Sequence, residues 1–126
     1  MNLYKKYKTA SVTTGNKIQQ MVFVFDEVIK LLYHVKKNIE TNNTEEQHKN
    51  LSKAIDVFYA MRTSVDIENG GEPAKHLDNF YILTIKAMEN LNIHNKGSIE
   101  EIDKLHKSIR EVRDAISEAA KLEGLM

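Results

Sequence analysis

The chain has 126 residues, the size of one domain, with 18 Lys plus Arg, 18 Asp plus Glu and no cysteine. A net charge of zero argues against a nucleic-acid binder, which needs surplus cations for phosphates, and the missing thiols exclude disulfides and zinc–thiolate sites. The N-terminus lacks the apolar stretch of a secretory signal, and the longest apolar run, Met21–Phe25, is far too short to span a bilayer. We therefore expect a soluble cytoplasmic protein that binds neither nucleic acid nor membrane.

Most of the chain has the composition and periodicity of helices. Proline occurs once, glycine is scarce, and apolar residues recur at i, i+3, i+4 and i+7 in four segments. The residues before the first segment form an N-terminal tail or short cap helix at 1–15, and a bundle occupies 16–122. The expected helices span about 16–41, 44–68, 72–94 and 98–122.

The connections between these segments are short. Thr41–Asn43 consists of poor helix formers, Asn69–Gly71 supplies two glycines for a tight reversal, and Asn95–Gly97 closes the third helix. Short connections force neighbouring helices to run antiparallel. The sequence therefore predicts an all-α fold, an antiparallel up-down four-helix bundle.

In each helix, the apolar residues at i, i+3, i+4 and i+7 form one stripe that faces the interior. Several further apolar residues lie beside these main stripes, which suggests more apolar surface than a bundle interior needs. A partner helix lying in a groove could cover them, as could the N-terminal tail with its Tyr4, Tyr7 and Val12. The alternative for Val24, Leu31 and Val57 is that wide stripes simply fill a small core. The candidate groove residues are Val24, Leu31, Val57, Phe80, Leu83 and Ala87.

Catalytic and metal-binding patterns are weak. Glu45 and His48 have the Glu-x-x-His spacing of di-iron bundles, but such a site needs a second copy and two inward carboxylates, and the apolar stripes contain none. His34 has lysines nearby, yet its surroundings lack the phosphoacceptor motif of histidine phosphotransfer domains. Phosphate loops and nucleophile elbows are absent. We expect no catalytic residue, metal or cofactor, and keep a generic bundle adaptor or a histidine phosphotransfer module as the alternative function.

A family resemblance extends this interpretation. The segment Ser64–Leu77, SVDIENGGEPAKHL, resembles the hallmark of the flagellar secretion chaperone (FliS) family, which reads roughly S-L-D-x-x-x-G-G-E-I-A-x-N-L. Other segments match in the same order and almost without gaps, over about residues 4 to 118. They are the Tyr-x-x-Tyr and Ser-Val-x-Thr pattern of Tyr4 to Thr14, Val24–Asp26, Phe80–Tyr81 and Arg110–Ile116.

The chain departs from the family pattern at a few positions. Pro73 replaces an aliphatic residue, Ile116 replaces a tryptophan and Val65 replaces a leucine, while Asn16 stands where the family has the N-cap before a proline. These differences mark a divergent member.

The resemblance implies a function that the residues alone do not reach. Members of this family bind the disordered C-terminal segment of flagellin, prevent its premature polymerisation and deliver it to the flagellar type III export apparatus without ATP. By resemblance we expect flagellin as the partner, with the export gate and flagellar regulatory proteins as possible further partners.

Overall fold

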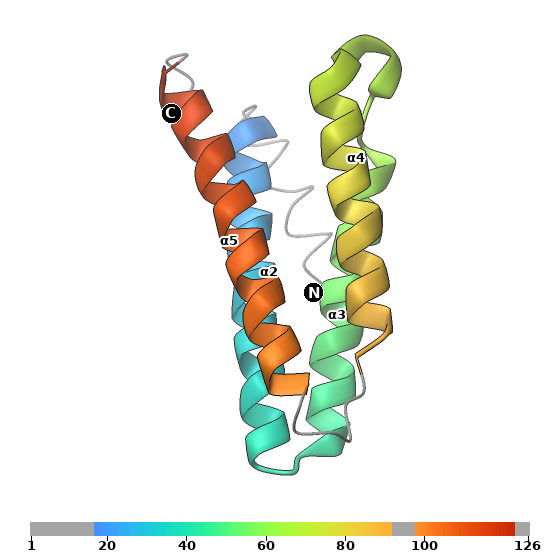
Figure 1. Cartoon of the computed structure of the whole chain (residues 1–126), viewed down its shortest axis with the longest axis vertical. Helices are drawn as coiled ribbons and strands as arrows, with labels where there is room; N and C mark the ends of the chain where they lie inside the picture. The colour runs from blue at the N-terminus through green and yellow to red at the C-terminus, as the bar shows by residue number, and fades with distance from the viewer. Residues whose placement is uncertain (1–16, 92–97, 123–126) are drawn as a thin grey trace.

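The computed structural model describes residues 17–91 and 98–122, and these form four α-helices. Figure 1 shows the helices running alternately up and down, which confirms the expected antiparallel four-helix bundle. The tail or cap helix expected at 1–15 lies outside the described residues. The helices are α2 (Lys17–Glu40), α3 (Thr44–Thr63), α4 (Ile67–Glu89) and α5 (Ser98–Leu122).

Aromatic rings from three helices meet in the core. Phe25 of α2, Phe58 of α3 and Tyr81 of α4 are fully buried, and their ring centroids lie 5.3 to 6.1 Å apart. Burying one large apolar side chain contributes on the order of 2 kcal/mol, and tilted ring pairs add to that. Aliphatic residues of the predicted stripes extend the core along the bundle, among them Val28, Leu32, Val35, Ile85, Met88, Ile102 and Ile109.

The four helices are not equally close to one another. Within the described residues, the close helix–helix contacts join α2 to α3, α2 to α5, and α3 to α4. Ion pairs reinforce two of these contacts, since Arg113 of α5 binds Asp26 of α2 at 2.9 Å, and Arg62 of α3 binds Asp78 of α4 at 2.9 Å. The bundle is therefore tight on three sides, and the fourth side lies between α4 and α5.

The connection between α3 and α4 starts earlier in the chain than expected and includes a short helical turn. The sequence suggests a helix to about residue 68 and a reversal at Gly70–Gly71, whereas α3 ends at Thr63 and α4 begins at Ile67. Asp66 accounts for the difference, because its side chain accepts a hydrogen bond from the backbone N–H of Asn69 at 3.1 Å and so caps a helix start.

The break expected at the glycines lies within α4, where a kink at Gly71 separates a first helical turn at 67–70 from the long part of the helix. Gly71 has φ 64° and ψ −145°, a backbone conformation that side chains with a Cβ rarely adopt. A Cβ placed on Gly70 would lie 2.6 Å from the Cβ of Ala74, so Gly70 also has no room for a larger residue. The kink sets the direction in which the rest of α4, starting at Pro73, runs down the bundle.

We expect Gly71→Ala to lower the free energy of unfolding by about 1–3 kcal/mol, because alanine is strained at this φ and ψ. Chemical denaturation of the purified chain measures the change. Asn79→Ala, at an exposed helical position of α4 after the kink, is the matched control and should stay within about 0.5 kcal/mol of the parent. Equal stability of the two variants would contradict the strained kink.

Candidate functional site

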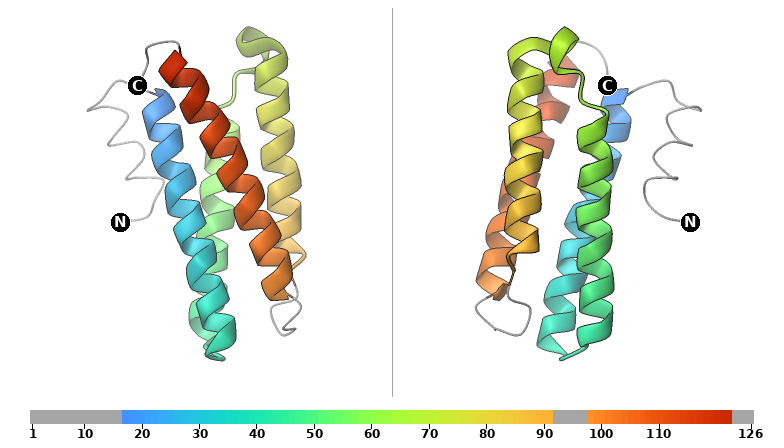
Figure 2. Two further views of the ribbon diagram at one scale, coloured as in Figure 1. Left: turned by 60° about the vertical axis from the view of Figure 1, so that its left-hand side comes forward. Right: turned by 90° about the vertical axis from the view of Figure 1, so that its right-hand side faces the viewer.

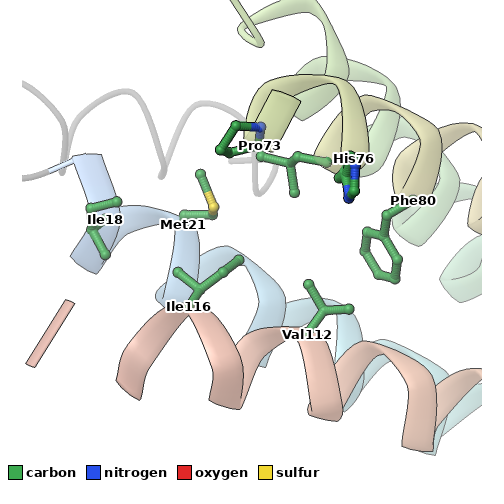
Figure 3. Close-up of a pocket in the computed structure, with 8 residues that line it drawn as sticks. Ile18, Met21, Pro73, His76, Phe80, Val112 and Ile116 are labelled. Atoms are coloured by element: carbon green, nitrogen blue, oxygen red, sulfur yellow. The ribbon is translucent and has the colours of Figure 1, made fainter. Parts of the chain in front are cut away.

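The open fourth side of the bundle contains an apolar groove with a volume of about 370 Å³. In Figure 3, Val112 and Ile116 of α5 lie opposite Pro73, His76 and Phe80 of α4. The start of α2 closes the groove at one end. The complete lining consists of Ile18, Met21, Pro73, His76, Leu77, Phe80, Val112 and Ile116.

The wall of the groove on α4 follows directly from the kink at Gly71. Pro73 lies just after the kink, and His76, Leu77 and Phe80 follow at helical spacing, so one face of α4 points into the groove. His76 is largely exposed, and its Nε2 lies 3.8 Å from a carboxylate oxygen of Glu72. This pair lies at the rim and leaves the floor of the groove apolar.

Phe80 joins the groove to the core. Its ring lies 5.8 Å from Phe25, 6.0 Å from Phe58 and 5.8 Å from Tyr81, measured between centroids, while its side chain also lines the groove. A charged substitution at this position would therefore disturb the buried ring cluster as well as the surface. Phe80 is a groove residue that cannot be altered without affecting stability.

The groove is suited to binding, by size and by chemistry. Its volume lies within the range of about 300–1,000 Å³ typical of binding pockets, and its walls are aliphatic and aromatic apart from the imidazole of His76. Three helices delimit it in the way that grooves for amphipathic partner helices are built. Apolar surface of this kind is costly to leave in water unless something covers it.

Two of the expected groove residues lie elsewhere. Val24 and Val57 are 1% and 5% exposed and belong to the core, so the alternative that they fill a small interior applies to both. Leu31 is half-buried and packs against the same core. Their positions beside the stripes reflect the width of the buried face, and the groove is formed without them.

The expected residues on α4 lie at or near the groove. Phe80 lines it, whereas Leu83, 65% exposed, and the exposed Ala87 are not lining residues. Both follow Phe80 at helical spacing, on the continuation of the same face of α4. Tyr4, Tyr7 and Val12, expected to cover a groove, lie outside the described residues, so their role stays a prediction.

Most of the lining residues were missed because they have the spacing of core residues. Ile18, Met21, Leu77, Val112 and Ile116 all fit the i, i+3, i+4 and i+7 spacing from which we expect a buried helix face, and the structure leaves them half-buried. A periodic pattern shows which face of a helix points inward, but not whether the opposite helix comes close enough to cover it. The departures from the family pattern were the available signal, since Pro73 and Ile116 both line the groove.

The histidines and carboxylates of the described residues form no comparable site. Among residues 17–91 and 98–122, no three His, Asp or Glu side chains gather closely enough to hold a metal ion. Glu45 and His48 lie on the exposed surface near the start of α3, and His34 is exposed on α2 with its ring edge-on to Tyr33. The groove is therefore the feature with the clearest binding chemistry.

Comparison with known proteins agrees with the resemblance seen in the sequence. Residues 1–123 match the family model described as "Flagellar protein FliS". No helix in the described part of the chain is long and apolar enough to cross a membrane.

Three proteins named flagellar secretion chaperone FliS are each 27% identical to this chain. The protein from Vibrio cholerae aligns over 118 residues, 91% of this chain and 84% of its own length. The one from Salmonella typhimurium aligns over 116 residues, 90% and 86%, and the one from Escherichia coli over 102 residues, 79% and 75%. Because the family model covers nearly the whole chain, this protein belongs to the FliS family of flagellar secretion chaperones, a family of chaperones and not of enzymes.

Proposed function

We propose that this protein is a cytoplasmic, ATP-independent export chaperone that binds the disordered C-terminal segment of flagellin. Membership of the FliS family supports the chaperone role. The observation that carries the binding mode is the open apolar groove of α2, α4 and α5. A flagellin segment folding into a helix there would cover Val112 and Ile116, and its own apolar face would be hidden from other flagellin molecules.

Coupled folding explains how such a complex can form and still be released. A disordered segment loses conformational freedom when it becomes helical, and this cost offsets part of the apolar burial. The chaperone can therefore cover a long stretch of flagellin with moderate affinity. Release at the export apparatus then requires competition for the segment and no nucleotide hydrolysis.

The groove wall on α4 offers the sharpest test of this proposal. His76 lies at the rim with its side chain largely exposed, so His76→Glu adds a charge to the groove without removing a core contact. We expect this variant to weaken binding of the cognate flagellin C-terminal segment by about 30-fold, the equivalent of about 2 kcal/mol for desolvating a charge. Isothermal titration calorimetry measures the affinity.

Leu83→Glu and Tyr59→Glu complete this experiment. Leu83 continues the groove face of α4 and should also weaken binding, whereas Tyr59, a half-exposed ring on α3, is not among the lining residues and should leave binding unchanged. All three positions are exposed, so circular dichroism should show full helicity. Normal binding by His76→Glu together with Leu83→Glu would place the flagellin site elsewhere.

Ile116→Trp tests whether cargo side chains enter the groove. The larger ring fills part of the cavity opposite Pro73, which should raise the melting temperature through extra apolar contact. The family pattern has tryptophan at this position, so the test uses the flagellin cognate to this chain, whose segment would occupy the space that isoleucine leaves. Its dissociation constant should rise by about tenfold, or ~1.4 kcal/mol. A variant that is more stable but binds with unchanged affinity would show that cargo does not reach this cavity.

A further inference from the structure

A second hollow lies on a different flank of α5, where this helix packs on α2. It has a volume of about 130 Å³ and shares no lining residue with the apolar groove. Figure 2, on the left, shows α2 and α5 side by side along their length. The hollow is lined by Leu32, Tyr33, Lys36, Ile102, Asp103 and His106.

Cations surround this hollow. Lys36 forms an ion pair with Asp103 at 3.0 Å, which neutralises the carboxylate in the lining. Lys37 lies over the ring of Tyr33, with its Nζ 5.6 Å from the centroid, and Arg110 is close enough to His106 to lower its pKa. Lys30 precedes Tyr33 by one helical turn and extends the cationic row along α2.

Two carboxylates farther along the helices, Asp26 of α2 and Asp114 of α5, are engaged by the same arginine. Arg113 binds Asp26 through two hydrogen bonds of 2.9 and 3.3 Å, and it also contacts Asp114 at 3.1 Å. Lys30, Lys37 and Arg110 are exposed cations on this flank, and Glu27 and Glu40 lie one helical turn from Lys30 and Lys37 on α2. We call Lys30, Tyr33, Lys36, Lys37, His106 and Arg110 the α2–α5 face.

We propose that the α2–α5 face binds an acidic segment of a second protein, whose carboxylates pair with Lys30, Lys37 and Arg110. An apolar or aromatic side chain of that segment enters the hollow. Leu32 and Ile102 contribute apolar side chains to its lining, and Tyr33, 51% exposed, offers a flat ring at its edge. Exposed tyrosine and arginine beside a small hollow are the residues that interfaces favour.

The chemistry of the hollow favours a protein segment over a nucleic acid or an anionic membrane. Leu32, Tyr33 and Ile102 in the lining suit an apolar or aromatic side chain of a peptide, and a phosphate backbone carries no such group. Only a few cations lie on the face, too few for the extensive phosphate neutralisation on which nucleic-acid affinity depends. Complementary charge on a small surface is typical of partner selection between proteins.

The two surfaces can be occupied at the same time. The groove uses Val112 and Ile116 of α5, whereas the hollow uses Ile102, Asp103 and His106. A protein carrying flagellin in the groove would thus keep the α2–α5 face available for the acidic partner. The second binding site does not depend on the first, and each can fail without the other.

The pKa of His106 depends on the charges around the hollow. Burial lowers the pKa of His106 from its usual value of 6.5, Arg110 and Lys36 lower it further, and Asp103 acts in the opposite direction. NMR titration should give a pKa below 6.5 that rises in Arg110→Gln. In the parent chain, the lowered pKa means that the folded state binds a proton at His106 more weakly than the unfolded state. His106 therefore makes the free energy of unfolding fall as the pH drops below 6.5. An unchanged pKa in Arg110→Gln would contradict the cationic surroundings.

The proposal is tested with the full chain and an acidic helical peptide of about 15 residues, glutamate-rich with one central phenylalanine. NMR shifts should concentrate at Tyr33, Lys37 and His106, and the affinity should fall with added salt. Lys37→Glu combined with Arg110→Glu should weaken binding by about tenfold or more. Lys53→Glu combined with Lys86→Glu, an equal change of charge on α3 and α4, should leave it unchanged.

The competing outcomes are distinct. Equal loss of affinity in both double variants, or shifts spread over the whole surface, would show only general attraction to charge and overturn the proposal. Tighter binding of duplex DNA or of phosphatidylglycerol vesicles at this face would also overturn it. His76→Glu serves as the reference for the groove and should bind the acidic peptide normally, so a failed flagellin assay and a failed peptide assay can be told apart.

Discussion

The four rings of Phe25, Phe58, Phe80 and Tyr81 determine how the helices are spaced. They come from α2, α3 and α4 and lie within about 6 Å of one another, so these three helices are held around a single aromatic cluster. α5 contributes no aromatic residue and packs against α2 through aliphatic side chains and ion pairs. The side chains of α5 that face α4 are the short Val112 and Ile116, which leave space between the helices where larger ones would fill it.

The groove therefore follows from the composition of the core, and it restricts how the protein can vary. Phe80 belongs to the groove and to the core, so the phenylalanine that lines the groove is also a residue that the core requires. Gly71 has a similar double role, since its unusual backbone conformation directs α4 and thus the wall containing Pro73 and His76. Binding specificity is more easily altered from the α5 wall, where Val112 and Ile116 have no ring contacts to preserve.

The sequence alone was sufficient for the helices, because helical periodicity is a local property and all four segments show it clearly. Between α3 and α4 the glycines correctly predict a break, since Gly71 leaves the helical conformation and the long part of α4 follows it. The sequence analysis missed the single helical turn before the glycines, which the hydrogen bond from Asn69 to Asp66 begins.

The groove could not be derived from periodicity for a different reason. Leu77 and Ile85 both belong to the apolar pattern of α4, about two turns apart, yet Leu77 lines the groove and Ile85 is buried. Which of the two is covered depends on the distance to α5 at each level of the bundle, a property of the whole fold. Val24 and Val57 show the converse, since they lie off the main stripes and are nevertheless enclosed by neighbouring helices.

The net charge of the chain does not show how its charges are distributed over the surface. Acidic residues occupy the first turns of α3, α4 and α5, where Glu45, Glu68 and Glu100 lie near the positive ends of the helix dipoles. Their charges thus contribute to helix starts, while Lys30, Lys37 and Arg110 are exposed on α2 and α5. A chain with equal numbers of acidic and basic residues can therefore present a cationic face. Its zero net charge argues against extended nucleic-acid binding but leaves a local acidic partner fully compatible with the fold.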